Sequence, residues 1–359
     1  MDLLEHYHEH PPQNDRFVLR KTMLPSDGDM NLYGARGSGK TALILDHLSQ
    51  QEKETLYIDL EDPNLILATL DTLPLQAYIE EYHIQELILD HYEEGMLEGF
   101  PLVTRLIVIS RLPLAEERFI PLQLFPLDYE EFLAFEPTAS GSIAFNHFLK
   151  SGTLPEMAKH IKNNTLFMKQ FFQQQFGPNE QALILILARY NTQPMTIHQI
   201  YSFTKESFKI SKDFVYSTMK QFQEEGLIYF IDNRIKRSGK KMIFYDFAFV
   251  KYLTASQPFG AQFDSMIALT LIKHHIDFST LGLHGYVTKE NELIIPAAFE
   301  SEEHFWVKAQ NKFSLFKKHG IKKITIITIA NSYHFDIEKL YFEALPFNEW
   351  SIAHTESEE

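Results

Sequence analysis

The sequence of 359 residues contains no cysteine. This absence excludes disulfides, a thiolate nucleophile, and zinc or iron–sulfur sites with thiolate ligands. Long apolar runs are missing too, since no run approaches the ~20 residues that a membrane-spanning helix needs. The first residues, Met1 to His6, are polar and acidic, unlike the cationic and then apolar pattern of a signal peptide. We therefore expect a cytoplasmic protein that does not contact a membrane.

Positive charge is scarce in the first part of the chain. The whole sequence has 33 basic and 48 acidic residues, so its formal net charge is 33 − 48 = −15. Residues 1–150 carry 10 − 26 = −16, and the remaining residues carry 23 − 22 = +1. Because an acidic surface repels a phosphate backbone, contact with nucleic acid is expected only in the second part. Hydrophobic residues make up 45% of the chain, which excludes global disorder.

Residues 34–41 match the pattern G-x-x-x-x-G-K-[ST], which binds nucleotide phosphates. The residues expected to bind the cofactor are Gly34, Ala35, Arg36, Gly37, Ser38, Gly39, Lys40 and Thr41. A short apolar strand is expected before them, at 30–33, and a helix after them, at 41–50. This order of strand, loop and helix is the one that the motif requires.

The residue types of this loop fit phosphate chemistry. Glycines let backbone N–H groups converge on phosphate oxygens, and the start of the following helix adds a positive dipole end. Lys40 is expected to reach the β- and γ-phosphates, and the Thr41 hydroxyl is expected to bind Mg²⁺. No guanine-reading N-K-x-D element follows, so the predicted cofactors are ATP and Mg²⁺.

Further strands are expected downstream of the loop. Residues 86–90 form an apolar run that ends in Asp90, the Walker B pattern of a carboxylate that holds Mg²⁺. Residues 106–110 end in Ser110, which is expected to contact the γ-phosphate or the attacking water. Strands that alternate with helices predict a parallel sheet covered on both faces, with the ligand at the carboxyl ends of the strands.

The residue after Asp90 is unusual, because His91 stands where a glutamate normally activates water. A neutral His91 can accept a proton, and Glu93 can reach the site if the loop bends. The third alternative is very slow hydrolysis in a nucleotide-dependent binder. We favour weak or partner-stimulated hydrolysis, with Arg111 and Arg118 as candidates for stabilising charge.

Two later segments carry a family resemblance. Residues 126–133 are Pro-Leu-Asp-Tyr-Glu-Glu-Phe-Leu, and residues 152–156 are Gly-Thr-Leu-Pro-Glu. With Arg36 in the phosphate loop and the strand and acidic turn at 57–63, they resemble the archaeal-type AAA ATPase family, which is also common in bacteria. The resemblance implies an α/β fold, in which an AAA-type P-loop NTPase domain is followed by a winged helix and a restriction-endonuclease-like α/β domain.

Residues 178–253 themselves predict a winged helix, with three helices and then a hairpin. The hairpin tip holds five cations and no acid: Arg234, Lys236, Arg237, Lys240 and Lys241. In a winged helix the third helix can enter a major groove while the wing touches the backbone. These cations are therefore candidates for contact with DNA phosphates, and the alternative is an ordinary solvated tip. The outward face of the third helix has mixed charge, so sequence-specific binding is not expected.

In the resembling family the last region carries the nuclease patterns "E-h-D-h" and "E-h-K" on two strands, whose carboxylates bind metal. Here residues 292–295 place isoleucine where the aspartate belongs. Residues 306–308, taken as the second strand, place Trp306 where the glutamate belongs and keep Lys308. Without the carboxylates a Mg²⁺ site lacks its ligands. We therefore expect an inactive nuclease-like domain.

The predicted organisation has three domains: a P-loop ATPase domain at 1–170 with a small helical part from about 128, a winged-helix domain at 171–255, and a degenerate nuclease-like domain at 256–359. The leading hypothesis is an ATP-binding protein with a slow or partner-stimulated ATPase activity. The alternative is a nucleotide-regulated module that binds DNA without significant hydrolysis. A protein partner or self-association also fits.

Three histidines alternate near the start of the chain, and Glu5 and Glu9 lie beside them: His6, His8 and His10. This pattern resembles a metal-ligand tract. We expect instead a flexible terminus without a metal site.

Overall fold

The computed structural model describes residues 3–12, 18–66, 70–137, 141–160, 164–236, 239–254 and 257–353. The chain divides into two compact units. Unit 1 comprises residues 1–126 and 224–226, and unit 2 comprises residues 127–223 and 227–359. The division into three domains stays a prediction.

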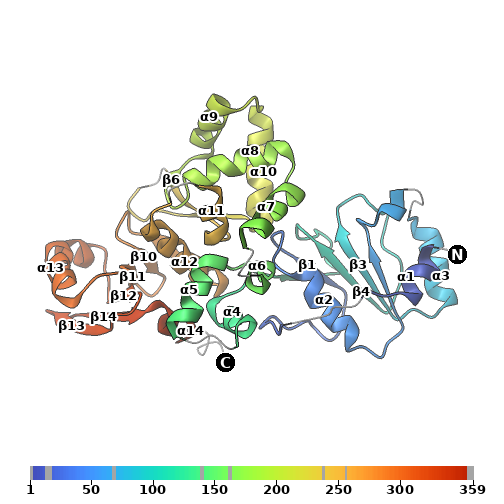
Figure 1. Ribbon diagram of the computed structural model, residues 1–359, viewed down its shortest axis with the longest axis horizontal. Helices are drawn as coiled ribbons and strands as arrows, with labels where there is room; N and C mark the ends of the chain where they lie inside the picture. The colour runs from blue at the N-terminus through green and yellow to red at the C-terminus, as the bar shows by residue number, and fades with distance from the viewer. Residues whose placement is uncertain are drawn as a thin grey trace. The chain divides into compact units, whose positions relative to one another are not determined.

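Unit 1 is built on a parallel sheet (Figure 1). Within the described ranges, its five strands lie in the order β2-β3-β4-β1-β5, and each neighbouring pair is parallel. They are β1 (Met30–Tyr33), β2 (Thr55–Asp59), β3 (Glu86–Tyr92), β4 (Arg105–Ser110) and β5 (Ile120–Gln123). The expected parallel sheet is confirmed, with β1 between β4 and β5.

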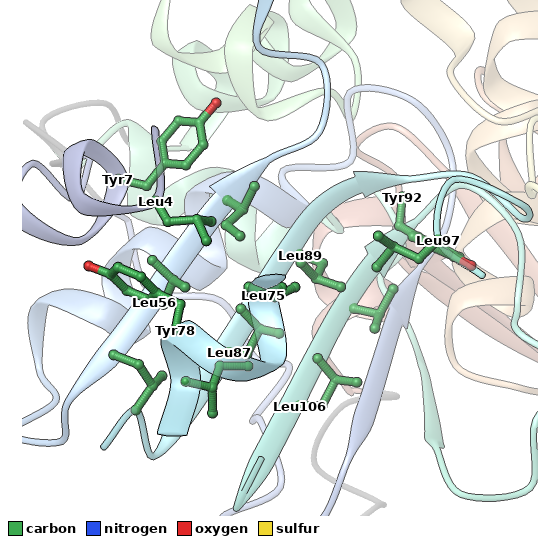
Figure 2. Close-up of a cluster of buried hydrophobic side chains, with 14 of the residues drawn as sticks. Leu4, Tyr7, Leu56, Leu75, Tyr78, Leu87, Leu89, Tyr92, Leu97 and Leu106 are labelled. Atoms are coloured by element: carbon green, nitrogen blue, oxygen red, sulfur yellow. The ribbon is translucent and has the colours of Figure 1, made fainter. Parts of the chain in front are cut away.

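Helices pack on both faces of this sheet, as continuous apolar strands require. They are α1 (Leu3–Glu9), α2 (Lys40–Ser49), the 3₁₀ turn η1 (Pro63–Ile66) and α3 (Thr72–Glu81). Alternate strand residues supply two cores, because successive side chains point to opposite faces. The first core joins α1 and α3 to the sheet (Figure 2) through Leu4, Tyr7, Leu56, Leu75, Tyr78, Leu87, Leu89 and Leu106. The second core lies against α2 and contains Met30, Leu32, Leu43, Ile44, Tyr57, Ile88 and Ile107.

The expectation of a flexible N-terminus is wrong for the described residues. Helix α1 is anchored because Leu4 and Tyr7 are buried in the first core. His8 Nε2 lies 2.8 Å from a Glu54 carboxylate oxygen. His6 and His10 stack on each other instead, with ring centroids 4.9 Å apart. Across the described ranges, no cluster of three or more histidine or acidic residues is arranged to hold a metal.

A buried ion pair links β3 and β4 at the ends where both strands begin. Glu86 is fully buried, and Arg105 Nη1 donates a hydrogen bond to its Oε1 at 2.9 Å. His47 of α2 lies 3.2 Å from the other carboxylate oxygen. Burial acts to raise the pKa of Glu86, but the bond to His47 and the charge interactions with His47 and Arg105 outweigh it and lower that pKa. The carboxylate is therefore part of the folded core.

The first part of unit 2 is helical and ends in a small antiparallel sheet. Its helices are α4 (Tyr129–Phe135), α5 (Gly141–Ser151), α6 (Pro155–Lys159), α7 (Asn164–Gln175), α8 (Pro178–Arg189), α9 (Ile197–Ser207), α10 (Lys212–Glu224) and α11 (Phe247–Leu253). The strands β6 (Pro194–Met195), β7 (Ile228–Ile231) and β8 (Lys240–Phe244) lie in the order β6-β8-β7. Thr196 caps α9 in a capping box with Gln199.

The last part of unit 2 holds a mixed sheet in the order β13-β14-β12-β11-β10-β9. Its strands are β9 (Phe278–Thr280), β10 (Tyr286–Thr288), β11 (Glu292–Pro296), β12 (Lys323–Thr328), β13 (Tyr333–Ile337) and β14 (Leu340–Pro346). Its helices are α12 (Phe259–Lys273), α13 (Glu302–Lys318) and α14 (Phe347–Ala353). Strands β11 and β12 are parallel and are joined through α13.

The strand expected at 306–308 is wrong, because Trp306 and Lys308 lie inside α13. The buried residues Phe305, Ala309 and Phe316 recur at helical spacing along this segment. A run of three residues is too short to distinguish a strand from a helix, whereas the spacing of the buried residues along the whole segment identifies a helix. The substitution of a strand glutamate by Trp306 therefore no longer stands as an argument for inactivity.

The two segments that carry the family resemblance have a structural role in unit 2. Asp128 caps α4, and its side chain accepts the Glu131 N–H at 2.7 Å. The two segments meet where the Leu127 N–H donates to the Thr153 carbonyl at 2.7 Å. The Thr153 hydroxyl donates to the buried carboxylate of Asp246 at 2.7 Å. These bonds fasten the helical part together.

We expect Gly152→Ala to lower the free energy of unfolding of unit 2 by roughly 2–4 kcal/mol. Gly152 has φ +75°, and an added Cβ would lie 2.8 Å from the Ala248 Cβ and closer still to the Asp246 carboxylate. Both tryptophans lie in unit 2, so urea unfolding followed by tryptophan fluorescence measures this unit. Gly260→Ala is the matched control, because nothing lies within 4 Å of its added Cβ. Equal unfolding of the two variants would contradict the prediction.

We expect Glu86→Gln to destabilise unit 1 by about 3–5 kcal/mol at neutral pH, because it leaves buried Arg105 without its counter-charge. The pKa of Glu86 is lower in the folded protein than its ordinary value of 4.5. The stabilisation is therefore present above pH 4.5 and disappears as the pH falls through the lowered folded pKa. Hydrogen exchange of the β3 and β4 amides should show the gap between wild type and variant narrowing in acid. A gap that is independent of pH would contradict this linkage.

Candidate functional site

The glycine-rich loop of unit 1 lies between β1 and α2, at the carboxyl end of β1. Gly34, Gly37 and Gly39 have φ values of 142°, 78° and 94°, which side chains rarely adopt. A Cβ on Gly34 would lie 2.6 Å from the carbonyl oxygen of Leu124. The glycines of the motif are therefore required by the backbone of the loop itself.

Helix α2 starts from this loop without a side-chain cap, since Gly39 is its N-cap. No acidic residue lies in its first turn. The first N–H groups of a helix have no partner within the helix, and its dipole favours an anion there. The hydroxyl of Ser38 is also buried and lacks a hydrogen-bond partner among the described residues. These features suit a phosphate group, whose oxygens accept such bonds.

Lys40 lies against the loop that precedes it. Its Nζ donates to the carbonyl oxygens of Gly34 at 2.8 Å and Ala35 at 3.1 Å. Burial lowers the pKa of Lys40 to about 8, although the charges of Asp90 and Glu225 oppose this shift. The amine therefore remains mostly protonated at neutral pH.

Arg36, the third residue of the motif, is buried. Its Nη2 lies 3.3 Å from Oε1 of Glu225, which belongs to the 224–226 segment of the same unit. Binding of phosphate by the Arg36 side chain stays a prediction, as it does for the rest of the motif.

Arg20 is a component of the loop that sequence reasoning missed. Its guanidinium is buried and donates to the carbonyl of Ser38 at 2.8 Å and to that of Phe125 at 2.7 Å. It thus joins the loop to the segment after β5. Arg20 lies outside every motif, so the pattern of the sequence offered no signal for this role.

Asp90 lies on β3 beside the end of β2, where Asp59 is its register partner. Its side chain is fully buried. The Tyr57 hydroxyl donates to its Oδ2 at 2.8 Å, and the backbone N–H of His91 donates to its Oδ1 at 2.7 Å. These two bonds, and the neighbouring charge of Lys40, stabilise the buried carboxylate.

His91 has a left-handed backbone, with φ 56°. It lies at an irregularity in the pairing of β3 with β4, between Leu89 and Tyr92. Its Nδ1 lies 2.7 Å from Oδ1 of Asp59. This hydrogen bond raises the pKa of His91 to about 8, against the effect of burial and with help from the charge of Asp90. The protonated imidazole favoured at neutral pH has no lone pair with which to accept a proton.

The remaining predicted catalytic residues have protein partners. Glu93 forms an ion pair with Arg111, and both side chains are partly exposed. The Ser110 hydroxyl accepts a bond from Asn31 Nδ2 at 2.8 Å and donates to the Leu112 carbonyl at 2.6 Å.

Arg118 donates from Nε to Asp29 at 2.8 Å, which fixes it beside β1. Its guanidinium also lies over the ring of Phe119, 5.3 Å from the centroid. The catalytic roles of these residues stay predictions.

The cations predicted for DNA contact lie in unit 2. Arg234 donates to Asn291 at 2.9 Å, Lys240 lies 2.9 Å from Asp232, and Lys241 forms an ion pair with Asp264. Lys236 is exposed, and Arg237 lies outside the described residues. The hairpin also bonds to β9, since the Arg234 N–H donates to the Thr280 carbonyl at 2.9 Å. Acidic and amide partners thus engage three of the four described cations.

The nuclease-like region has a cavity of about 180 Å³ lined by Lys308, Lys312, His284 and Glu300. Lys308 forms an ion pair with Glu300. Glu292 lies 3.4 Å from Lys323 and is not among the residues that line the cavity. This cavity therefore offers one carboxylate rather than a group of metal ligands.

None of the helices in the described ranges combines the length and the apolar character that crossing a membrane requires.

No protein-family model matches this chain, and no curated protein matches it. Among solved structures, the chain is similar to the Walker-type ATPase paby2304 of Pyrococcus abyssi. The two chains share 11% sequence identity with a TM-score of 0.41, over 64% of this chain and 91% of the other.

We expect Arg20→Met to destabilise unit 1 by about 2–4 kcal/mol, because the carbonyl oxygens of Ser38 and Phe125 lose charged donors. Methionine keeps much of the volume but has no donor. Arg20→Lys should recover part of the loss, since one ammonium group can reach one of the two carbonyls. Hydrogen exchange of the β1 and α2 amides measures the effect. Unchanged exchange in Arg20→Met would show that the bonds contribute little.

Proposed function

We propose that this chain is an ATP-binding protein and that unit 1 hydrolyses ATP slowly or with stimulation by a partner. The conformation of the glycine-rich loop carries this proposal. Three glycines in left-handed conformations bend the backbone between β1 and α2, and the start of α2 is free of acidic side chains. Lys40 and the buried Ser38 hydroxyl lie in the same loop.

We expect Lys40 to change its hydrogen-bond acceptors when a nucleotide binds. Its present acceptors are two neutral carbonyl oxygens of its own loop. Phosphate oxygens carry charge and form stronger hydrogen bonds with an ammonium group. We therefore assign Lys40 to the β- and γ-phosphates.

The residues present fit Mg²⁺, which prefers oxygen ligands and keeps several waters. Thr41 is the second residue of α2, and its hydroxyl makes no hydrogen bond within the described part of the chain. Asp90 is a buried carboxylate whose charge interacts with Lys40. Thr41 would bind the metal directly, and Asp90 would hold it through water. When bound, the ion neutralises charge on the phosphates.

We further propose the AAA type for unit 1 and two additional folds within unit 2. The order α8, α9, α10 and then the β7–β8 hairpin supports a winged helix. Strands β11 and β12, parallel and joined through α13, support a nuclease-like α/β fold. The single carboxylate at the Lys308 cavity supports an inactive nuclease.

The alternative, a nucleotide-regulated DNA-binding module without significant hydrolysis, has less support. Its phosphate contacts would come from the hairpin cations, and three of these already bond to Asn291, Asp232 and Asp264. DNA contact would have to replace these bonds with bonds to phosphates.

Calorimetric titration with Mg·ATP tests the proposal. We expect Lys40→Ala to weaken binding about 100-fold or more, because a charged contact with two phosphates is lost. The exposed Lys53 of the same unit gives the matched control, and Lys53→Ala should bind as the wild type does. Chelation of Mg²⁺ should weaken binding by the wild type. Equal affinity of Lys40→Ala and wild type, or no binding by either, would refute the proposal.

A further inference from the structure

The glutamate that normally follows the Walker B aspartate and activates the attacking water is missing, because His91 follows Asp90. We propose that Asp59, at the end of the neighbouring strand β2, supplies the carboxylate that orients and deprotonates the attacking water, and that His91 positions it. This inference rests on the proposed ATPase function of unit 1.

The sheet places Asp59 next to the Walker B carboxylate. Asp59 and Asp90 are register partners on parallel strands, and neighbouring strands lie roughly 4.8 Å apart. Both residues therefore lie at the carboxyl edge of the sheet, where the glycine-rich loop also begins. A carboxylate at the end of β2 can therefore take the role of the glutamate that normally follows the Walker B aspartate on β3.

The hydrogen bonds of Asp59 leave one of its oxygens available. Its Oδ1 is held by His91 Nδ1 at 2.7 Å and by the Glu61 N–H at 3.0 Å. Its Oδ2 forms no hydrogen bond with any described residue, and 41% of the side chain is exposed. The carboxylate is thus fixed on one side and open to water on the other.

The backbone of His91 explains why its ring bonds to Asp59. The bulge in β3 and the left-handed φ of 56° re-aim the side chain relative to a regular strand. Such strained positions persist only where the surrounding structure holds them, and they cluster at functional sites. Here the His91 N–H donates to Asp90 while the ring bonds to Asp59. One residue therefore links the two carboxylates.

The other predicted bases are less suited to this role. Glu93 is paired with Arg111, so its carboxylate has a cationic partner. The His91 ring uses Nδ1 for Asp59 Oδ1, whereas Asp59 keeps Oδ2 for a water molecule. Asp59 combines a carboxylate, a fixed orientation and exposure to water.

In the proposed step the water oxygen forms a bond to the γ-phosphorus. The bond between that phosphorus and the β–γ bridging oxygen breaks, and its electron pair leaves with ADP. Oδ2 of Asp59 accepts the proton of the water and later releases it to solvent. General-base assistance of this kind contributes about 10²–10⁴-fold to a rate.

Asp59→Asn tests the proposal, because it keeps the shape and the acceptor for His91 but removes the base. We expect the turnover of ATP to fall about 100-fold or more, while the calorimetric dissociation constant for Mg·ATP stays within about threefold. The variant should also retain ATP rather than ADP after desalting. Glu52→Gln removes an exposed carboxylate elsewhere in unit 1 and should behave as the wild type does.

His91→Asn tests the positioning role, since asparagine tolerates the left-handed backbone. We expect a loss of turnover of about 10–100-fold with unchanged ATP affinity. The double variant should be no slower than Asp59→Asn alone, because His91 acts through Asp59. Additive losses in the double variant would overturn the positioning role.

The outcomes separate this inference from the proposed function. If the wild type binds and hydrolyses ATP and Asp59→Asn does so at the same rate, the role of Asp59 is wrong and the ATPase stands. Loss of turnover in Glu52→Gln instead of Asp59→Asn has the same meaning. If the wild type binds Mg·ATP without turnover, the inference also fails, but nucleotide binding survives. Absence of binding by the wild type refutes the proposed function itself.

Discussion

The candidate site of unit 1 depends on the burial of one carboxylate, Asp90. An ionised carboxylate in a dry interior is costly unless hydrogen bonds and charge compensate it. Tyr57 supplies one bond from β2, and the backbone N–H of His91 supplies the other. To donate to the side chain of the preceding residue, His91 leaves regular strand geometry and takes a positive φ. This backbone conformation directs the His91 ring toward Asp59. The burial of Asp90 thereby also orients the Asp59 carboxylate.

The glycine-rich loop is stabilised by a different kind of interaction, because side-chain donors bond to its backbone carbonyl oxygens. Lys40 donates to the carbonyls of Gly34 and Ala35, and Arg20 donates to the carbonyl of Ser38. The bonds of Lys40 can be exchanged for bonds to phosphate, while those of Arg20 tie the loop to the segment after β5. The loop can therefore keep its shape when Lys40 changes partners.

Several patterns were predicted correctly because local chemistry decides them. The parallel sheet follows from short apolar strands that alternate with helices. The patterns that failed were short. Trp306 and Lys308 were assigned to a strand from three residues, but helix α13 buries Phe305, Ala309 and Phe316 along one face. The terminus before the first strand was expected to be flexible, although Leu4 and Tyr7 anchor α1 in the core.

The sequence by itself determined the glycine-rich loop, the acid at the end of an apolar strand, and the absence of thiol chemistry. Residue type and spacing along the chain suffice for these features. Only the tertiary structure decided that Asp59 lies beside Asp90, that Arg20 holds the loop, and that Asp246 accepts a hydrogen bond from Thr153. Asp59 and Asp90 are 31 positions apart in the sequence, Arg20 and Ser38 are 18 apart, and Thr153 and Asp246 are 93 apart. Strand order and side-chain packing, which no local pattern encodes, bring them together.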